Sequence, residues 1–464
     1  MTRERTRERA DVVICGAGIA GIAAAYHLAV TQRIGRVILV DERPPLSLTS
    51  DKSTECYRNW WPGPGDAMVA LMNRSIDLLE EWADRSSNVF HLNRRGYLFA
   101  TADPARVANF RAAGEEAASL GAGPLRTHSG GGSDPPFELS PAQGYLGQPD
   151  GADLITDGDL LRRHFPYLSG STVAAIHPRR CGWFSAQQLG MYLLSEAQAH
   201  GARLIQGRVE AVETSGGRFQ ALRLNSPSGV DGIDAGAYVV AAGPLLREAG
   251  TMLGVDLPVV AELHAKVAMA DPLHVVPRDA PLLIWADPQH LPWSEEERAE
   301  LDSSEASRWM LGEFPSGVHA RPEGPDDSPI LLILWTYHTE TVEPKFPPAF
   351  DPTYPEIALR GLATMIPGLQ AYFGRAPRPV VDGGYYLKTR ENRPLIGPLP
   401  VERTFVIGAL SGFGLMASPA AGELVASWVA GAARPAHGRA FQLERYEDPA
   451  YQKLLEDWGT TGQL

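Results

Sequence analysis

Cysteine is scarce in this chain of 464 residues, which contains only Cys15, Cys56 and Cys181. Three scattered cysteines are too few for a disulfide framework and lack the spacing of metal ligands, so we expect no metal site. Positive charge is also in short supply, because 42 lysines and arginines face 55 aspartates and glutamates and leave a net charge of -13. This balance argues against a surface that binds nucleic acid or an anionic membrane.

No segment carries a plain membrane or export signal. The apolar stretch near the N-terminus is interrupted by glycines in a regular pattern, and residues 2–9 before it mix arginines with acids. We therefore expect a cytoplasmic protein with no membrane span, in which residues 1–9 form a flexible tail. A chain of 464 residues exceeds one ordinary hydrophobic core, which indicates two domains.

Residues 10–43 carry the strongest signal in the sequence. An apolar strand at 12–15 enters GAGIAG at 16–21, an alanine-rich helix follows, and a second strand at 37–40 ends in two acids. This order of strand, glycine turn, helix, strand and acid is typical of a dinucleotide-binding unit. The segment therefore predicts that the chain binds a dinucleotide.

Each glycine of this turn has its own role. Gly16 allows the tight turn, Gly18 lets the backbone approach a pyrophosphate, and Gly21 lets the helix lie close to its strand. The N–H groups and the positive dipole end of the helix then receive the phosphates. Asp41 is placed to accept hydrogen bonds from a ribose, with Glu42 as the near alternative.

Three later segments are predicted to complete the nucleotide site. Polar side chains at 50–53 suit a second phosphate or the edge of a flavin, although an ordinary helix start over 50–60 would explain them too. A strand at 237–240 runs into a second glycine turn, and a strand at 404–408 leads to glycines at the mouth of a helix over 417–430. The further candidate cofactor residues are Ile19, Ala20, Ser50, Lys52, Ser53, Ala242, Gly243, Gly412, Phe413, Gly414, Leu415 and Met416.

The remaining sequence indicates a second domain inserted into the first. Residues 259–379 alternate strands with long loops, which predicts an antiparallel sheet. The nucleotide-binding domain is assigned to 10–85, 150–255 and 380–435, the second domain to 86–149 and 256–379, and a C-terminal extension to 436–464. Within them we expect helices over 67–83, 104–120 and 182–201, a hairpin over 90–101 and a mobile surface loop over 128–142.

Three segments together resemble the D-amino acid oxidase superfamily of FAD enzymes, which includes sarcosine oxidase and glycine oxidase. They are the N-terminal fingerprint, residues 201–243 and residues 385–422 with YYLKTRENRPLIG and GALSGFGLMASPAAG. The resemblance implies an α/β fold, in which a Rossmann-type FAD-binding domain carries an inserted, mainly antiparallel β-sheet substrate domain. It also implies FAD as cofactor, oxidation of a C–N bond next to a carboxylate, and contact between adenine and the backbone at Val209.

Comparison with sarcosine oxidase at the pocket also shows departures. Glu55 stands at the first arginine of its T-R-x-x-R segment, and Leu334 at a lysine associated with oxygen activation. Gly384 stands at the cysteine that carries a covalent flavin, and Met416 at the lysine that holds the substrate carboxylate. These differences imply that FAD is non-covalent, put fast reaction with oxygen in doubt, and argue against a small N-methyl amino acid as substrate. Glu55 would instead attract a cationic amine.

The resemblance keeps three of the pocket residues. Arg58 is expected to pair with a substrate carboxylate, although a salt bridge to Glu55 or to a phosphate is the alternative. His338 is expected to accept a proton or to orient the substrate amine, which must be neutral to give up hydride, unless it is a structural histidine. Tyr386 is expected to form a wall of the pocket.

Strand alternation adds further candidates. His264 and Lys266 would lie on one face of a strand, turned either to the flavin or to solvent. Lys388 shares the parity of Tyr386 and so its face, although an exposed lysine is the commoner outcome. We therefore name Arg58, His338, His264, Tyr386 and Lys388 as the candidate catalytic residues.

The expected function is oxidation of the C–N bond of an amino acid or amine by hydride transfer to FAD, giving an imine. The electron acceptor is oxygen or another molecule, and the substrate and oligomeric state stay open. Two alternatives remain at this point: a 2-hydroxy acid dehydrogenase of the same fold, and a flavin-bearing subunit of a larger complex.

Overall fold

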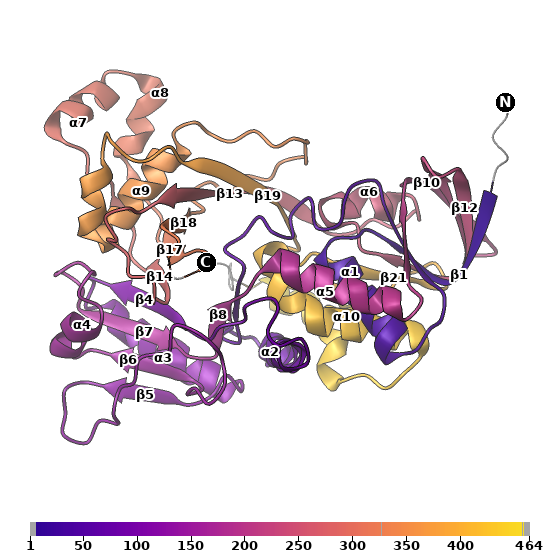
Figure 1. The fold of residues 1–464 in the computed structure, drawn as a ribbon, viewed down its shortest axis with the longest axis horizontal. Helices are drawn as coiled ribbons and strands as arrows, with labels where there is room; N and C mark the ends of the chain where they lie inside the picture. Colours follow the sequence, from indigo (N-terminus) through magenta and orange to yellow (C-terminus); the bar gives the residue numbers. More distant parts are fainter. Residues whose placement is uncertain (1–5, 326, 457, 459–464) are drawn as a thin grey trace.

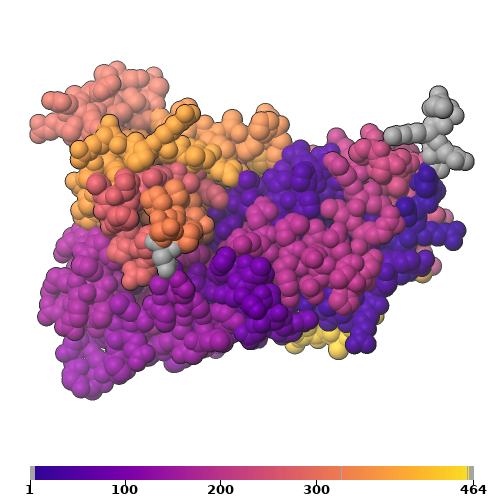
Figure 2. Space-filling model, viewed as in Figure 1, coloured from indigo at the N-terminus to yellow at the C-terminus, as the bar shows by residue number. Residues whose placement is uncertain are grey.

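The computed structural model describes residues 6–325, 327–456 and 458, which form two lobes (Figure 1). One lobe is built on an eight-stranded sheet and the other on a nine-stranded sheet. In the space-filling view the indigo and magenta segments of the first lobe and the purple and orange segments of the second occupy opposite ends of the molecule (Figure 2). The two sheets confirm the predicted α/β architecture.

The eight-stranded sheet has a parallel centre. Its strands run in the order β10, β11, β12, β1, β2, β9, with β21 on β12 and β20 on β21, and neighbours from β21 through β12, β1 and β2 to β9 are parallel. Their bounds are β1 (Thr6–Cys15), β2 (Val37–Asp41), β9 (Arg203–Gln206), β10 (Arg208–Ser215), β11 (Arg218–Asn225), β12 (Val230–Val240), β20 (Leu395–Pro398) and β21 (Thr404–Gly408).

A layer of helices covers one face of this sheet (Figure 1). It contains α1 (Ile19–Tyr26), α2 (Ala67–Arg85), α5 (Ala186–Ala199) and α10 (Gly414–Ala430). Alternation along β1 sends Val12 and Ile14 into the core beneath these helices and Val13 into the core on the opposite face. Helices α1 and α10 cross closely because Gly422 lacks a side chain; a Cβ there would lie 2.8 Å from the Cβ of Ala23.

The nine-stranded sheet is mainly antiparallel, as predicted. Its order is β19, β13, β18, β17, β14, β4, β7, β6, β5, and only the β14–β4 and β5–β6 neighbours are parallel among the described strands. Their bounds are β4 (Tyr97–Thr101), β5 (Leu125–His128), β6 (Ala152–Ile155), β7 (Ala174–Pro178), β13 (Val260–Ala270), β14 (Leu282–Trp285), β17 (His319–Pro322), β18 (Ile330–Leu334) and β19 (Val380–Lys388). Helix α9 (Tyr354–Met365) packs on it with its apolar residues buried.

Shorter elements complete the fold. A two-stranded ribbon of β3 (Cys56–Arg58) and β8 (Cys181–Trp183) is separate from both large sheets. The other elements are α3 (Arg106–Ser119), α4 (Gly158–His164), α6 (Leu246–Thr251), α7 (Glu295–Asp302), α8 (Glu305–Arg308), α11 (Pro449–Glu456), β15 (Gln289–His290), β16 (Glu313–Phe314) and the short helices η1 (His27–Thr31), η2 (Gly243–Leu245), η3 (Trp309–Leu311), η4 (Pro367–Tyr372), η5 (Ser411–Phe413), η6 (Ala436–Phe441) and η7 (Leu443–Glu447).

Several predicted boundaries are wrong. Residues 6–9 are not a tail, because they pair with β12 as the start of β1, whereas 1–5 lie outside the described residues. The predicted helix start at 50–60 instead leads into strand β3, and the predicted hairpin at 90–101 contains only β4, whose partners come from distant sequence. The predicted helix at 182–201 begins only at Ala186, because Cys181–Trp183 pair with β3.

The predicted domain boundaries also shift. Strands β6, β7 and β19 belong to the nine-stranded sheet, although their sequences fall in segments assigned to the nucleotide-binding domain. Their apolar residues fit either sheet, and only long-range pairing decides between the two. No helix within residues 6–325, 327–456 and 458 has both the length and the apolar composition needed to cross a membrane.

Candidate active site

The glycine turn after β1 has no room for side chains. Gly16 has a φ of +113°, and a Cβ there would lie 2.2 Å from the carbonyl oxygen of Ala241. A Cβ on Gly21 would lie 2.0 Å from the carbonyl oxygen of Gly16. The turn between β1 and α1 therefore packs backbone to backbone against the end of β12, which leaves the N-terminus of α1 open to a ligand.

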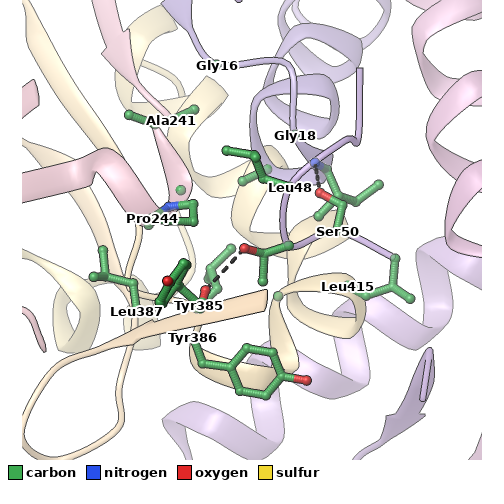
Figure 3. A pocket seen from close by; sticks show the side chains of 18 of the residues that line it. Gly16, Gly18, Leu48, Ser50, Ala241, Pro244, Tyr385, Tyr386, Leu387 and Leu415 are labelled. Atoms are coloured by element: carbon green, nitrogen blue, oxygen red, sulfur yellow. Dashed lines mark hydrogen bonds between the residues drawn. The ribbon is translucent and has the colours of Figure 1, made fainter. Parts of the chain in front are cut away.

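A cleft of about 890 Å³ opens at this N-terminus. Figure 3 shows its walls: Gly16 and Gly18 from the glycine turn, Leu48 and Ser50 from the loop after β2, Ala241 just after β12, Pro244 from η2, and Leu415 from α10. The predicted cofactor residues that line it are Gly16, Gly18, Ile19, Ala20, Asp41, Ser50, Ser53, Ala242, Gly243, Gly412, Gly414 and Leu415.

Hydrogen bonds fix the loop that follows β2 across the cleft. Ser50 Oγ accepts from the N–H of Ile19 at 3.0 Å, and Thr49 Oγ1 donates to the carbonyl of Tyr385 at 3.1 Å (Figure 3). The Lys52 ammonium lies 2.9 Å from the carboxylate of Asp382 on β19, and this ion pair holds the loop in place. Lys52 itself does not line the cleft. We refer to residues 46–55 as the strap.

A second cavity of about 690 Å³ continues from the first. The two share Gly16, Asp41 and Ala242, and Glu42 and Val209 line the second. Asp41 accepts hydrogen bonds from the N–H groups of Ala17, at 2.8 Å, and Arg43, at 2.9 Å, and burial raises the pKa of its carboxyl group. The carboxyl group of Asp41 thus stands at the junction of the two cavities.

A third cavity of about 520 Å³ meets the first at Ser53, Tyr386 and Gly412. The three cavities share lining residues and so form one continuous space beside the glycine turn, and its backbone lining there suits a dinucleotide with a second small molecule beyond it. The third cavity is lined by Ser53, Thr54, Cys56, Arg58, Tyr97, His264, His319, Leu334, Thr336, Tyr386, Gly412, Phe413 and Met416, so both lobes contribute.

Arg58 brings a buried cation to the third cavity. Its side chain extends from β3, is only 6% exposed, and stacks on Trp61 with 4.7 Å between the guanidinium carbon and the ring centroid. Burial lowers the pKa of the guanidinium, which makes an anion in the same cavity a favourable neighbour. Glu55 lies 3.7 Å from Arg321, and burial raises the pKa of its carboxyl group to about 7.

His264 extends from β13 into the same cavity. Its ring stacks on Tyr386 with 4.1 Å between centroids, its Nδ1 lies 2.9 Å from Thr336 Oγ1, and its Nε2 lies 3.1 Å from Glu262 Oε2. The other carboxylate oxygen of Glu262 lies 2.5 Å from the Lys388 ammonium. Lys388 does not line the cavity but stands behind His264, on the face that it shares with Tyr386.

Lys266, the neighbour of His264 on the same face, points to the strap. Its ammonium donates to the carbonyls of Asp51, at 2.6 Å, and Ser53, at 3.1 Å. It is the cross-strand partner of Leu334, which lines the third cavity. Lys266 therefore holds the strap in place from the side of the nine-stranded sheet.

The structure does not bring His338 to these three cavities. Strand β18 ends at Leu334, and His338 is exposed beside the rings of Trp309 and Tyr337, at centroid distances of 5.4 and 4.6 Å. The predicted strand through residue 337 would have kept His338 on the cavity face, but the regular alternation stops at the strand end. Thr336, two residues earlier, lines the cavity instead.

His319 was missed by the sequence reasoning. It lies on β17 opposite Leu334, its Nδ1 is 2.9 Å from the carbonyl oxygen of Gly317, and burial lowers the pKa of its ring to about 4. The strand is only four residues long, and Ala-Arg-Pro after the histidine gave no clear alternation. Its register opposite β18, which only the folded structure provides, is what places His319 in the cavity.

Known proteins share the fold of this chain. The family model described as FAD dependent oxidoreductase matches residues 11–428. Mitochondrial dimethylglycine dehydrogenase of the mouse, Mus musculus, is 22% identical over 462 residues; these are 98% of this chain, which spans 45% of that relative's length. L-proline dehydrogenase from P. horikoshii has a TM-score of 0.72 and 19% identity, and the match covers 95% of this chain and 99% of that one. Glycine oxidase from Geobacillus kaustophilus has a TM-score of 0.69 and 18% identity, and the match covers 94% of this chain and 99% of that one.

Proposed function

The chain belongs to the FAD-dependent oxidoreductase family whose model matches it, and we propose that it oxidises the C–N bond of an amino acid or of another amine that carries a carboxylate. It is an enzyme with FAD as cofactor, as the sequence predicted. The similar proteins named above take their names from dimethylglycine, L-proline and glycine, which all combine an amine with a carboxylate. This common chemistry supports the proposal.

The observation that carries the proposal is that Arg58 and His264 line the same cavity, next to the cofactor cleft. When bound, FAD supplies the hydride acceptor that converts the C–N single bond of the substrate into an imine. Arg58 binds the substrate carboxylate through its planar fork of N–H donors. Tyr386 and Gly412 line both the cofactor cleft and the third cavity, so they lie where substrate and cofactor meet. Leu334, Phe413 and Met416 keep water from the apolar part of the substrate.

The cofactor residues have distinct positions in this proposal. The N–H groups of Gly18 and Ala20 would receive the pyrophosphate beside the Ile19 N–H, which donates to Ser50 Oγ, and Asp41 would bind the ribose of the adenosine half. Glu42 and Val209 line the adenine end. The backbone at Gly412 and Gly414, where η5 leads into α10, faces the flavin ring.

FAD is expected to be bound without a covalent link. Gly384 on β19 offers no thiol, and burial raises the pKa of Cys56, the cysteine of the third cavity, to about 11, so that its reactive thiolate is scarce at neutral pH. Precipitation of the yellow protein with acid should therefore leave the flavin in the supernatant. Flavin absorbance that stays in the pellet after washing would contradict this prediction.

Anaerobic mixing of the flavin-loaded enzyme with a panel of compounds tests the reaction. We expect amines with a carboxylate to bleach the visible flavin absorbance, and their amide derivatives to do so far more slowly, because an amide offers Arg58 no charge. A panel in which only 2-hydroxy acids bleach the flavin would favour the dehydrogenase alternative. If no compound bleaches it, the alternative of an electron-carrying subunit gains support.

Readmission of air in the same cuvette identifies the class of acceptor. Leu334 places an apolar side chain in the wall of the cavity, and the ammonium of its neighbour Lys266 is already bonded to two strap carbonyls. We propose slow recovery of absorbance in air and fast recovery with an artificial acceptor such as a quinone, which is the behaviour of a dehydrogenase. Recovery in air within the turnover time would identify an oxidase.

A further inference from the structure

We infer that Thr336, His264 and Glu262 form a relay that takes the proton from the substrate's ammonium group. The inference rests on the proposed oxidation of an amine, because an ammonium ion has no lone pair with which to form the C=N bond. Thr336 and His264 both line the third cavity, so they are placed to remove this proton from a bound substrate. The relay begins at the cavity wall and ends at the Glu262–Lys388 ion pair behind it.

Strand pairing explains why these residues meet. Strand β13 lies between β18 and β19, with Lys266 opposite Leu334 on one side and Glu262 opposite Tyr386 on the other. Side chains at alternate positions of β13 share a face, so Glu262 and His264 both point to the side on which Tyr386 lies. Thr336 follows the end of β18 at the level of His264.

The hydrogen-bond distances set the direction of the relay. Burial alone would raise the pKa of Glu262, but hydrogen bonds from His264 and Lys388 and the charge of Lys388 bring that pKa below its ordinary value. Glu262 is therefore ionised and can only accept, which assigns the ring proton of neutral His264 to Nε2. Nδ1 then accepts from the Thr336 hydroxyl, whose remaining lone pair is available to the cavity.

The proton transfer balances without any other reactant. The ammonium N–H bond breaks as its proton moves to Thr336 Oγ1, and the hydroxyl proton moves on to His264 Nδ1. The substrate becomes a neutral amine, and His264 becomes an imidazolium whose Nε2–H points at the carboxylate of Glu262. Thr336 and His264 are the catalytic residues of this step. Glu262 orients the His264 ring and balances the charge of the imidazolium, and Lys388 holds Glu262 in place.

The surroundings of His264 favour its neutral form. Burial lowers the pKa of its ring, Glu262 raises it through a hydrogen bond and its charge, and the charge of Lys388 lowers it. Arg58 and His319 line the cavity that His264 faces, and Lys266 lies two residues along the same strand face. His264 is thus neutral before the substrate arrives, as a proton acceptor must be, and its proton is not held so tightly that it could not leave again.

A second histidine–carboxylate pair in the same sheet provides an internal reference. His128 Nε2 lies 3.0 Å from Asp153, a distance close to that in the His264–Glu262 pair. His128 packs against Phe137 and lines none of the three cavities described above. A buried histidine–carboxylate pair in this sheet can therefore be structural, and contact with the cavity is what distinguishes His264.

The first test is nitrogen NMR of the flavin-loaded protein with labelled histidine, which requires no turnover. Loss of one signal in His264→Asn assigns the ring. In the wild type we expect a neutral His264 with its proton on Nε2, and in Glu262→Gln a titration midpoint at lower pH, because the carboxylate that stabilises the imidazolium is gone. The signals of His128 should be the same in both proteins, and Glu356→Gln, which removes an ion-paired acid from α9, should leave His264 unchanged. An unchanged His264 midpoint in Glu262→Gln would overturn the relay.

The second test is the pH profile of flavin bleaching by a saturating amine under anaerobic conditions. Thr336→Val and Glu262→Gln should bleach about 10- to 100-fold more slowly than wild type near pH 7 and approach the wild-type rate near pH 10, where the amine enters already neutral. Thr336→Ser, which keeps the hydroxyl, should bleach faster than Thr336→Val near pH 7. Variant profiles parallel to that of the wild type would overturn the relay while leaving amine oxidation intact. If no amine bleaches the wild type, the proposed function fails, and the NMR result alone decides whether the relay exists.

Discussion

Replacing Gly16 with alanine is expected to abolish retention of FAD. The φ of +113° is a conformation that side chains rarely adopt, and the new methyl group would lie 2.2 Å from the carbonyl oxygen of Ala241. Either the turn or the end of β12 has to move, and both form walls of the cofactor cleft. A distortion of about 3 kcal/mol would weaken FAD binding about a hundredfold.

The measurement is the flavin fluorescence released on dilution of the purified protein, together with the thermal midpoint with and without added FAD. Gly35→Ala is the matched control, because Gly35 has no positive φ and a Cβ there would meet no atom within 4 Å. Gly21→Ala should behave like Gly16→Ala, since its methyl group would lie 2.0 Å from the carbonyl oxygen of Gly16. Normal FAD binding in both variants would mean that the cofactor does not depend on the glycine turn.

Replacing Arg58 with glutamine is expected to weaken binding of the substrate about 100- to 1000-fold while FAD stays bound. The substrate carboxylate would enter a buried cavity without the cation that balances it, and the loss of one partner from such a pair costs about 3 to 4 kcal/mol. Arg58→Lys should recover only part of this loss, because lysine keeps the charge but not the planar fork or the stacking on Trp61.

The dissociation constant is measured from the shift of the flavin spectrum on titration with a carboxylate ligand. The amide of the same ligand should bind weakly to both proteins, and its affinity should hardly change on mutation, which separates the loss of the ion pair from general damage to the cavity. Arg74→Gln is a suitable control, because Arg74 on α2 forms an ion pair with Glu423 on α10 and does not line the third cavity. Equal losses for the carboxylate and the amide would show that Arg58 acts on the shape of the cavity and not as the carboxylate partner.

Local sequence was sufficient to predict the cofactor cradle. Residues 16–18 connect β1 to α1 and residues 409–413 connect β21 to α10, so the position of the backbone N–H groups there follows from the order of elements within a short segment. The same reasoning was only partly successful for the strap. It offered the polar residues at 50–53 to a phosphate or the flavin edge, with a helix start as the alternative; Ser50 and Ser53 line the cleft, whereas Lys52 pairs with Asp382. The strap is held by Asp382 and by carbonyl contacts from Lys266, which belong to strands more than 200 residues away.

The third cavity could be predicted only in part. Alternation put His264 and Lys266 on one face of their strand without deciding between flavin and solvent, and the resemblance made Tyr386 a wall of the pocket. The structure brings the rings of His264 and Tyr386 together. The neighbours that give His264 its chemistry were not apparent, because no motif singled out Glu262 and Thr336 lies past the end of a strand. His319 and His338 show the same limit: the register and the last residue of a strand decide which side chain reaches the cavity, and long-range pairing decides both.

The cofactor cleft also has a consequence for biosynthesis. Its walls come from residues 16–53, 241–244, 385–387 and 407–415, and β1 has its parallel neighbour β12 more than 200 residues further along the chain. A nascent chain of which only the N-terminal fingerprint has left the ribosome therefore has the glycine turn but no cofactor cleft. We expect flavin to be captured only after β21 and α10 have emerged from the ribosome, so that a shortage of riboflavin would accumulate chains that are fully synthesised and lack only their ligand.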